Sequence, residues 1–240
     1  MACARGCVVR MARHRYEETR VLRDGREMLI RNATIADVPQ VVAAFPLPQP
    51  MVAPEVVFRS YAEAKTLMYV RAGVADITCG FVDEELAGYQ FYCRDLAALR
   101  RFTTSPGNVG WLLTEAVRGR FGYSPGFWLK CARWGLQHFR QPGAYSEAQA
   151  DLPRDCDTIR TWSRGVRTVD AYQRLGVASY LMDHTERVLA EEGIDRMALW
   201  TSVGNAPAIA LFEKRGFVRR ARVARIGEDC WLMLKDLSRM

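Results

Sequence analysis

Residues 173–178 read Gln-Arg-Leu-Gly-Val-Ala and lead directly into a long amphipathic pattern. Its apolar and small positions fall on one helical face, namely Ala178, Leu181, Met182, Thr185, Val188 and Leu189. A helix that begins here presents free backbone N–H groups and a positive dipole end to an anion. Gly176 allows close backbone approach without a Cβ atom, and Arg174 adds a positive charge. The stretch therefore predicts a phosphate-binding turn at a helix start.

The segments on either side of this turn predict alternating strands and helices. A strand is expected over 158–169, interrupted by Gly165, and another over 196–201. Asn205 is a suitable N-cap for a helix that stops at Gly216, and closing strands follow over 217–223 and 230–234. Toward the N-terminus the pattern predicts a hairpin over 21–30 around an Asp-Gly turn, helices over 34–45 and 55–70, and a second hairpin over 78–92.

This order predicts an α+β fold, in which a mixed, mostly antiparallel sheet carries helices on both faces. Residues 95–145 interrupt it with a helical, aromatic pattern that turn signals divide into about three helices. We expect these residues to be an insertion within one domain spanning 21–240. Residues 1–20 are expected to be a flexible leader.

Composition narrows the classes of function. No segment has the roughly 18 consecutive apolar residues of a membrane span, and residues 1–20 lack the long apolar core of a signal peptide. Seven cysteines without a CxxC pair or a histidine at zinc-ligand spacing indicate reduced thiols, a cytoplasmic location and no metal. Cys79, Cys93 and Cys230 lie in apolar runs and are expected in the core. The net charge of +7 suits either CoA phosphates or a nucleic acid, but the basic residues are dispersed.

A second motif narrows the class of ligand expected at the turn. The chain has neither GxGxxG nor GxxxxGK[ST]. About thirty residues after the turn, residues 205–217 read Asn-x-x-Ala-x-x-Leu-Phe-x-x-x-Gly-Phe. The turn and this helix together resemble the GNAT family, the Gcn5-related N-acetyltransferases. The resemblance is specific over 166–217, fainter over 21–45 and in the closing strands, and absent from 95–157.

The resemblance implies an enzyme that transfers an acetyl group from acetyl-CoA to an amine by direct attack in a ternary complex. The strand before the turn would splay from its neighbour, and its backbone would pair with the pantetheine arm. The turn would hold the pyrophosphate, Asn205 would lie near the acyl end, and Phe212 would line the CoA channel. The implied CoA-binding residues are Val166, Arg167, Thr168, Gln173, Arg174, Leu175, Gly176, Val177, Ala178, Asn205 and Phe212.

The sequence gives weaker evidence for the general acid and the general base of the reaction than for the CoA-binding residues. Many family members have a tyrosine at the position of Phe212, and phenylalanine cannot protonate a leaving thiolate. The expected strand has no carboxylate in its middle, so Asp157 at its entrance is the candidate base, and Glu147 is an alternative. His184 is expected to be a surface or packing residue, and Asp170 is expected to have a capping or structural role.

Two other classes of function remain open at this stage. A GNAT-like domain that binds acyl-CoA without turnover, as a sensor or interaction module, is compatible with Phe212 and the missing base. A nucleic-acid binder is the weaker alternative. The sequence does not identify the amine acceptor, which is a small molecule or a peptide. Four aromatic residues of the insertion would suit an apolar or cationic amine, namely Trp111, Phe127, Trp128 and Trp134. We expect a monomer or homodimer that does not bind membranes.

Overall fold

One eight-stranded sheet forms the centre of the molecule. The computed structural model describes residues 16–46, 54–121, 129, 159–225 and 228–238. In this part of the chain the strands lie in the order β1-β2-β3-β4-β5-β6-β8-β7. Their bounds are β1 Glu18–Val21, β2 Glu27–Asn32, β3 Asp76–Val82, β4 Glu85–Cys93, β5 Trp162–Thr168, β6 Arg196–Ser202, β7 Val218–Arg225 and β8 Glu228–Asp236. All neighbouring strands are antiparallel except β5 and β6, which confirms the predicted mixed, mostly antiparallel sheet.

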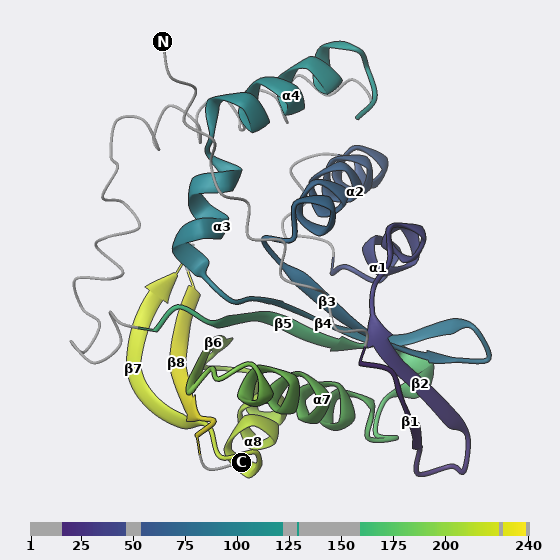
Figure 1. Cartoon of the computed structure of the whole chain (residues 1–240), viewed down its shortest axis with the longest axis vertical. Helices are drawn as coiled ribbons and strands as arrows, with labels where there is room; N and C mark the ends of the chain where they lie inside the picture. The colour runs from purple at the N-terminus through teal and green to yellow at the C-terminus, as the bar shows by residue number, and fades with distance from the viewer. Residues whose placement is uncertain (1–15, 47–53, 122–128, 130–158, 226–227, 239–240) are drawn as a thin grey trace.

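Helices cover both faces of the sheet, as the sequence predicts. Figure 1 shows α1 and α2 on one side and α7 and α8 on the other. The described helices are α1 Val38–Ala43, α2 Glu55–Ala72, α3 Leu96–Thr103, α4 Pro106–Val117, α7 Val177–Glu191 and α8 Ala206–Lys214. None of these helices is both long enough and apolar enough to cross a membrane.

Apolar side chains on the two faces of the sheet form separate cores, because successive residues of a strand point to opposite faces. On the α7 face, Met197 and Leu199 of β6 pack with Met182 of α7 and Phe212 of α8. On the α2 face, Ala198 of β6 packs in a cluster with Tyr69, Leu99 and Trp162. We therefore refer to these as the α7 face and the α2 face.

The first hairpin begins earlier than the sequence predicts. Gly25 has a φ of +88° in its turn, as an Asp-Gly hairpin requires. Strand β1 begins at Glu18, so residues 18–20 pair with β2 instead of belonging to a leader. The physical reason is that the Glu18 carboxylate forms an ion pair with Arg187 of α7 and lies against the buried His184 of the same helix, which ties this strand to the rest of the fold. Residues 1–15 lie outside the described part of the chain.

The insertion contains the first two of its three predicted helices. Asp95 caps α3 by accepting a hydrogen bond of 2.8 Å from the N–H of Ala98, and Ser105 caps α4. The third predicted helix, over 127–139, lies outside the described residues apart from Leu129. The strand predicted over 158–169 is shorter than expected and begins at Trp162.

Asp37 joins the first helix of the fold to strand β2. Its carboxylate accepts hydrogen bonds of 2.7 and 2.8 Å from the Arg31 guanidinium and one of 2.6 Å from the N–H of Thr34. Burial raises the pKa of this carboxyl, but the hydrogen bonds from Arg31 and Thr34 outweigh that effect and lower the pKa from 3.8 to about 2. The folded state therefore favours the ionised carboxylate.

Replacing Asp37 with asparagine is expected to lower the free energy of unfolding at neutral pH. Because the folded pKa lies below the unfolded one, the contribution of Asp37 is complete above pH 3.8 and is lost as the pH falls through about 2. Denaturant titrations of both proteins between pH 7 and pH 2 should therefore converge at the acid end. A stability difference that stays constant over this range would contradict the assignment.

Candidate functional site

The turn at residues 173–178 has the geometry of an anion-binding site. Arg174 and Gly176 both have positive φ angles, +63° and +99°, and Gly176 is the N-cap of α7. No acidic residue occupies the first turn of α7. In the described part of the chain, no hydrogen bond is donated by the backbone N–H groups of residues 174–178. These groups are therefore available to a ligand at the positive end of the helix dipole.

The neighbouring hairpin holds this turn through its carbonyl groups. The backbone N–H of Arg23 donates to the Leu175 carbonyl at 3.3 Å, and the Arg23 guanidinium donates to the Arg174 carbonyl at 3.2 Å. The Tyr180 hydroxyl donates to the Val21 carbonyl at 3.1 Å. Since the hairpin engages the carbonyl oxygens, the turn keeps its shape while its N–H groups stay free.

Strand β5 has a partner along its whole length on one side only. It pairs with β4 from Trp162 to Thr168. On the other side it pairs with β6 only through Trp162 with Ala198 and Ser163 with Leu199. The two strands therefore splay apart after Ser163, as the family resemblance implies. No strand in the described part of the chain pairs with the edge of residues 164–168 that faces β6, and this edge leads toward the turn at the start of α7.

A bulge in β5 lies next to the point where the strands separate. The register with β4 shifts between Phe91 and Tyr92, so that Arg164 is an extra residue beside Gly165, which has a φ of +154°. Ser163, which is 5% exposed, points to the α7 face, where its hydroxyl accepts a hydrogen bond of 3.3 Å from the buried amide of Gln90.

Gly88 allows β4, β5 and the start of α7 to approach closely. A Cβ atom at this position would lie 2.6 Å from the backbone oxygen of Arg167 and 2.8 Å from Cγ1 of Val177. Gly88 is not among the predicted site residues. A glycine inside an otherwise apolar strand is the signal that identifies it, because such a glycine often marks a close backbone approach.

Helix α8 contributes the two remaining predicted residues. Asn205 caps the helix, since its Oδ1 atom accepts a hydrogen bond of 3.2 Å from the N–H of Ala208. Phe212 is 7% exposed, and its ring lies 5.9 Å from that of Phe217. Val166 of β5 packs against the same apolar cluster. Asn205 is thus exposed at the helix start, whereas Phe212 packs beneath the helix.

The predicted acid–base candidates do not come together at the splay in the described part of the chain. Asp157 and Glu147 lie outside the described residues. Asp170 accepts a hydrogen bond of 2.7 Å from the Gln173 side chain, in line with its predicted structural role. His184 is 1% exposed, and its Nδ1 atom lies 3.1 Å from a Glu18 carboxylate oxygen. Burial lowers the pKa of His184, and its packing role is confirmed.

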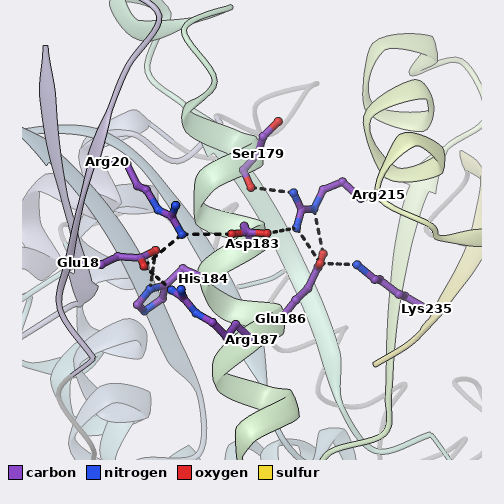
Figure 2. Close-up of polar contacts among 9 residues, drawn as sticks. All are labelled: Glu18, Arg20, Ser179, Asp183, His184, Glu186, Arg187, Arg215 and Lys235. Carbon is purple, nitrogen blue, oxygen red and sulfur yellow. Dashed lines mark hydrogen bonds and ion pairs between the residues drawn. The ribbon is translucent and has the colours of Figure 1, made fainter. Parts of the chain in front are cut away.

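A network of ion pairs anchors α7, the helix that carries the turn. Figure 2 shows it running from Glu18 and Arg20 of β1, across Asp183 and Glu186 of α7, to Arg215 and Lys235. Glu186 is fully buried, and its carboxylate accepts hydrogen bonds of 2.7 Å from Arg215 and 2.5 Å from Lys235. Arg215 also donates to the Ser179 carbonyl at 3.0 Å. Contacts from both ends of the sheet therefore fix the position of α7.

The described cysteines are core residues, as predicted. Cys79, Cys93 and Cys230 are free and buried. Burial raises the pKa of the Cys79 thiol above its usual range and that of the Cys93 thiol to about 11, so neither supplies a thiolate at neutral pH. The described residues also contain no group of three or more side chains suited to hold a metal ion.

A cavity lies between α2 and the helices α3 and α4. Residues of α2, α3 and α4 surround a volume of about 560 Å³, with Trp111 in its wall and the buried carboxylate of Glu115 beside it. Glu115 is paired with Arg118 and Arg120. Phe127, Trp128 and Trp134 lie outside the described residues.

Comparisons with known proteins agree with this geometry. Residues 140–217 match the model of the acetyltransferase (GNAT) family. No curated protein sequence matches the chain. The fold is similar to that of the ribosomal-protein-S18-alanine N-acetyltransferase from Escherichia coli, with a TM-score of 0.51, 14% identity and coverage of 88% of this chain and 94% of that one.

Two further solved structures have the same fold. One is described as an acetyltransferase and has a TM-score of 0.58, 13% identity and coverage of 87% of this chain and 99% of that one. The other is an N-acetyltransferase from Staphylococcus aureus Mu50, with a TM-score of 0.52, 12% identity and coverage of 88% and 99%. The resemblance to the GNAT family is therefore confirmed: residues 140–217 match its model, and the described chain has the fold of these acetyltransferases.

Proposed function

We propose that this protein is an N-acetyltransferase that moves an acetyl group from acetyl-CoA to an amine within a ternary complex. The proposal rests on two neighbouring stretches of backbone that have hydrogen-bonding groups without partners in the described part of the chain. The free N–H groups of residues 174–178 lie at the end of β5, and the edge of residues 164–168 lacks a strand partner. A polyanion joined to an amide-containing arm can satisfy both stretches at once, and acetyl-CoA is such a molecule.

In this proposal each part of the site has a separate task. The N–H groups of the turn and the Arg174 side chain bind the pyrophosphate. The backbone of Val166, Arg167 and Thr168 pairs with the pantetheine amides. Five residue steps separate Thr168 from Ser163, which is about 17 Å along a strand. The thioester then lies where β5 and β6 separate, and Asn205 lies near the acyl end.

The reaction requires two proton movements. The amine nitrogen forms a bond to the thioester carbon as the carbon–sulfur bond breaks, and the acetylated nitrogen loses a proton while the CoA thiolate gains one. Phe212 cannot supply that proton, so we propose that the solvent does. We keep Asp157 as the proposed base that accepts the proton of the amine.

The alternative proposal is a GNAT-like domain that binds acyl-CoA without turnover. Phe212 favours it, because the side chain has no proton to donate. Incubation with acetyl-CoA and a panel of amines, followed by detection of the free CoA thiol and of the acetylated product, separates the two. Acetyl-CoA binding without product from any amine would support the alternative and contradict the enzyme.

Replacing Gly176 with alanine is expected to weaken acetyl-CoA binding about tenfold. A left-handed backbone costs a non-glycine residue roughly 1–2 kcal/mol, so the free turn relaxes away from the shape that binds, and binding has to restore it. The added Cβ atom would also lie 3.2 Å from the Tyr180 ring. The matched control is Gly193→Ala, which places alanine at a φ of +77° at the other end of α7, with no atom within 4 Å. Calorimetric titration with acetyl-CoA should distinguish the two variants. Equal losses of affinity would mean that the turn does not contact the ligand.

A further inference from the structure

Two arginines of β5 point to the α2 face of the sheet, opposite to α7. Their orientation follows from the register with β4. Tyr89, Phe91 and Cys93 belong to the clusters on the α2 face, and they pair with Arg167, Gly165 and Trp162. Arg167 therefore points to the α2 face, and Arg164 joins it as the extra residue of the bulge. The positive charge of Arg164 acts on Tyr69 and Cys93, and that of Arg167 acts on Tyr89, which agrees with this placement.

Among the described residues, neither arginine has an acidic partner. Both residues are exposed, and no ion pair in the described part of the chain involves them. Arginines elsewhere near the sheet are paired, for example Arg31 with Asp37 and Arg215 with Glu186. An arginine side chain offers five N–H donors in a fork that matches a carboxylate or phosphate. Two free guanidinium groups on one face of one strand are therefore suited to bind an anion.

Their position relates this anion site to the proposed reaction. Arg164 immediately follows Ser163, the last residue of β5 that pairs with β6. The turn that would hold the donor's phosphates belongs to α7, on the other face of the sheet. A molecule that reaches the separation point from the α2 face would meet Arg164 first, with Arg167 three residues further along the strand. The acceptor is the reactant left to approach from this face.

We propose that Arg164 and Arg167 bind an anionic group, a carboxylate or a phosphate, on the acceptor, so that the acceptor class is an amine that also carries an acid. This inference rests on the proposed function. In the Michaelis complex the guanidinium groups hold the acidic end of the acceptor and orient its amino nitrogen toward the thioester carbon. They are binding residues for specificity and take no part in the proton transfers.

The test compares matched pairs of amines with and without an acidic group. Amino acids would be assayed beside their carboxamides, and amino alcohol phosphates beside the free amino alcohols, with release of the CoA thiol as the signal. For wild type we expect kcat/KM to be higher for the acidic member of each pair. The carboxylate and phosphate arms show which anion is preferred. Equal or lower values for the acidic members would overturn the inference, although the proposed function would stand.

Two variants locate the effect on the arginines. Arg164→Ala is expected to lower kcat/KM for the acidic amines about 10- to 100-fold, as for the loss of a charged hydrogen bond, and to leave the neutral amines and acetyl-CoA affinity nearly unchanged. The backbone of Arg167 belongs to the proposed donor site, so Arg167→Ala is judged by the ratio of kcat/KM for the acidic amine to that for its neutral partner. This ratio is expected to fall by a similar factor. Arg196→Ala is the matched control, because Arg196 is half-exposed at the far end of β6. A loss of acetyl-CoA affinity in the Arg164 variant, or an equal loss of kcat/KM for acidic and neutral amines in either variant, would overturn the inference.

Direct binding tests the role of the two arginines even if no amine is acetylated, an outcome that would remove the proposed function. Calorimetric titration of the acetyl-CoA-loaded protein with the same acidic amines should then show binding to wild type and Arg196→Ala but not to the double variant Arg164→Ala, Arg167→Ala. Binding that is unchanged in the double variant, or absent from wild type, would overturn the inference.

Discussion

Replacing Glu186 with alanine is expected to lower the free energy of unfolding by about 3–5 kcal/mol, the cost of breaking a buried ion pair by removing one partner. Glu186 is fully buried in α7, and its carboxylate neutralises both Arg215 and Lys235, which are only 14% and 13% exposed. Without it Lys235 loses its carboxylate partner, and Arg215 keeps only one carboxylate among the described residues, that of Asp183, whose side chain is 43% exposed. Chemical denaturation at neutral pH, followed by circular dichroism, measures the loss.

Two further proteins separate the charge effect from the loss of packing. Glu213→Ala removes an acid from the exposed pair with Arg219, in which both side chains are more than 40% exposed, and should cost less than about 1 kcal/mol. A triple variant, Glu186→Leu with Arg215→Leu and Lys235→Met, removes all three charges and should recover much of the stability lost in Glu186→Ala. If the triple variant were no more stable than the single one, the buried cations would not be the cause.

Replacing Gly88 with alanine is expected to cost about 3 kcal/mol of stability, at the upper end of overpacking effects, and also to weaken acetyl-CoA binding. The added Cβ atom would lie 2.6 Å from the backbone oxygen of Arg167, which cannot turn away as a flexible side chain can. Its other close neighbour is Val177, the first residue of α7. Relief of the overlap must therefore move β5 or the start of α7, and both belong to the proposed donor site.

Gly110→Ala is the matched control for this substitution. Gly110 lies within α4, where an added Cβ atom meets nothing within 4 Å, so alanine should stabilise that helix by up to about 1 kcal/mol. Thermal unfolding and acetyl-CoA titration of both variants give the comparison. Unchanged acetyl-CoA affinity in a folded Gly88→Ala protein would mean that the spacing between β4 and α7 does not govern the donor site.

The parts of the fold that local sequence signals determine could be predicted. The turn at 173–178 and the helix capped by Asn205 occur where expected, because glycine and capping requirements depend on a few adjacent residues. The hairpin around Gly25 was also predicted, but the start of β1 was not. Glu18 lies in a strand that is tied to α7 by the ion pair with Arg187, more than 160 residues away, and no local pattern predicts such a contact.

The same limit applies to the candidate site. The two-residue pairing of β5 with β6 is a property of the sheet, although the family resemblance led us to expect the splay. The ion pair of Glu186 with Arg215 joins residues that 29 positions separate, so sequence spacing does not predict it. The orientation of Arg164 and Arg167 depends on the bulge at Gly165, which shifts the alternation of the strand. The sequence shows a glycine there, but only the register with β4 shows which face each arginine takes.

The long segment between β4 and β5 affects how the length of the chain can vary among proteins with this fold. Cys93 ends β4 and pairs with Trp162, about 70 residues further along the chain. The entropy of closing a loop grows only with the logarithm of its length, and doubling the length costs about 0.6 kcal/mol. The ladder between these strands is therefore insensitive to how much chain lies between them. Proteins with this sheet can lengthen, shorten or replace the segment between β4 and β5. The side of the site that faces the acceptor can change with it, while β5 and the turn that follows it keep their positions.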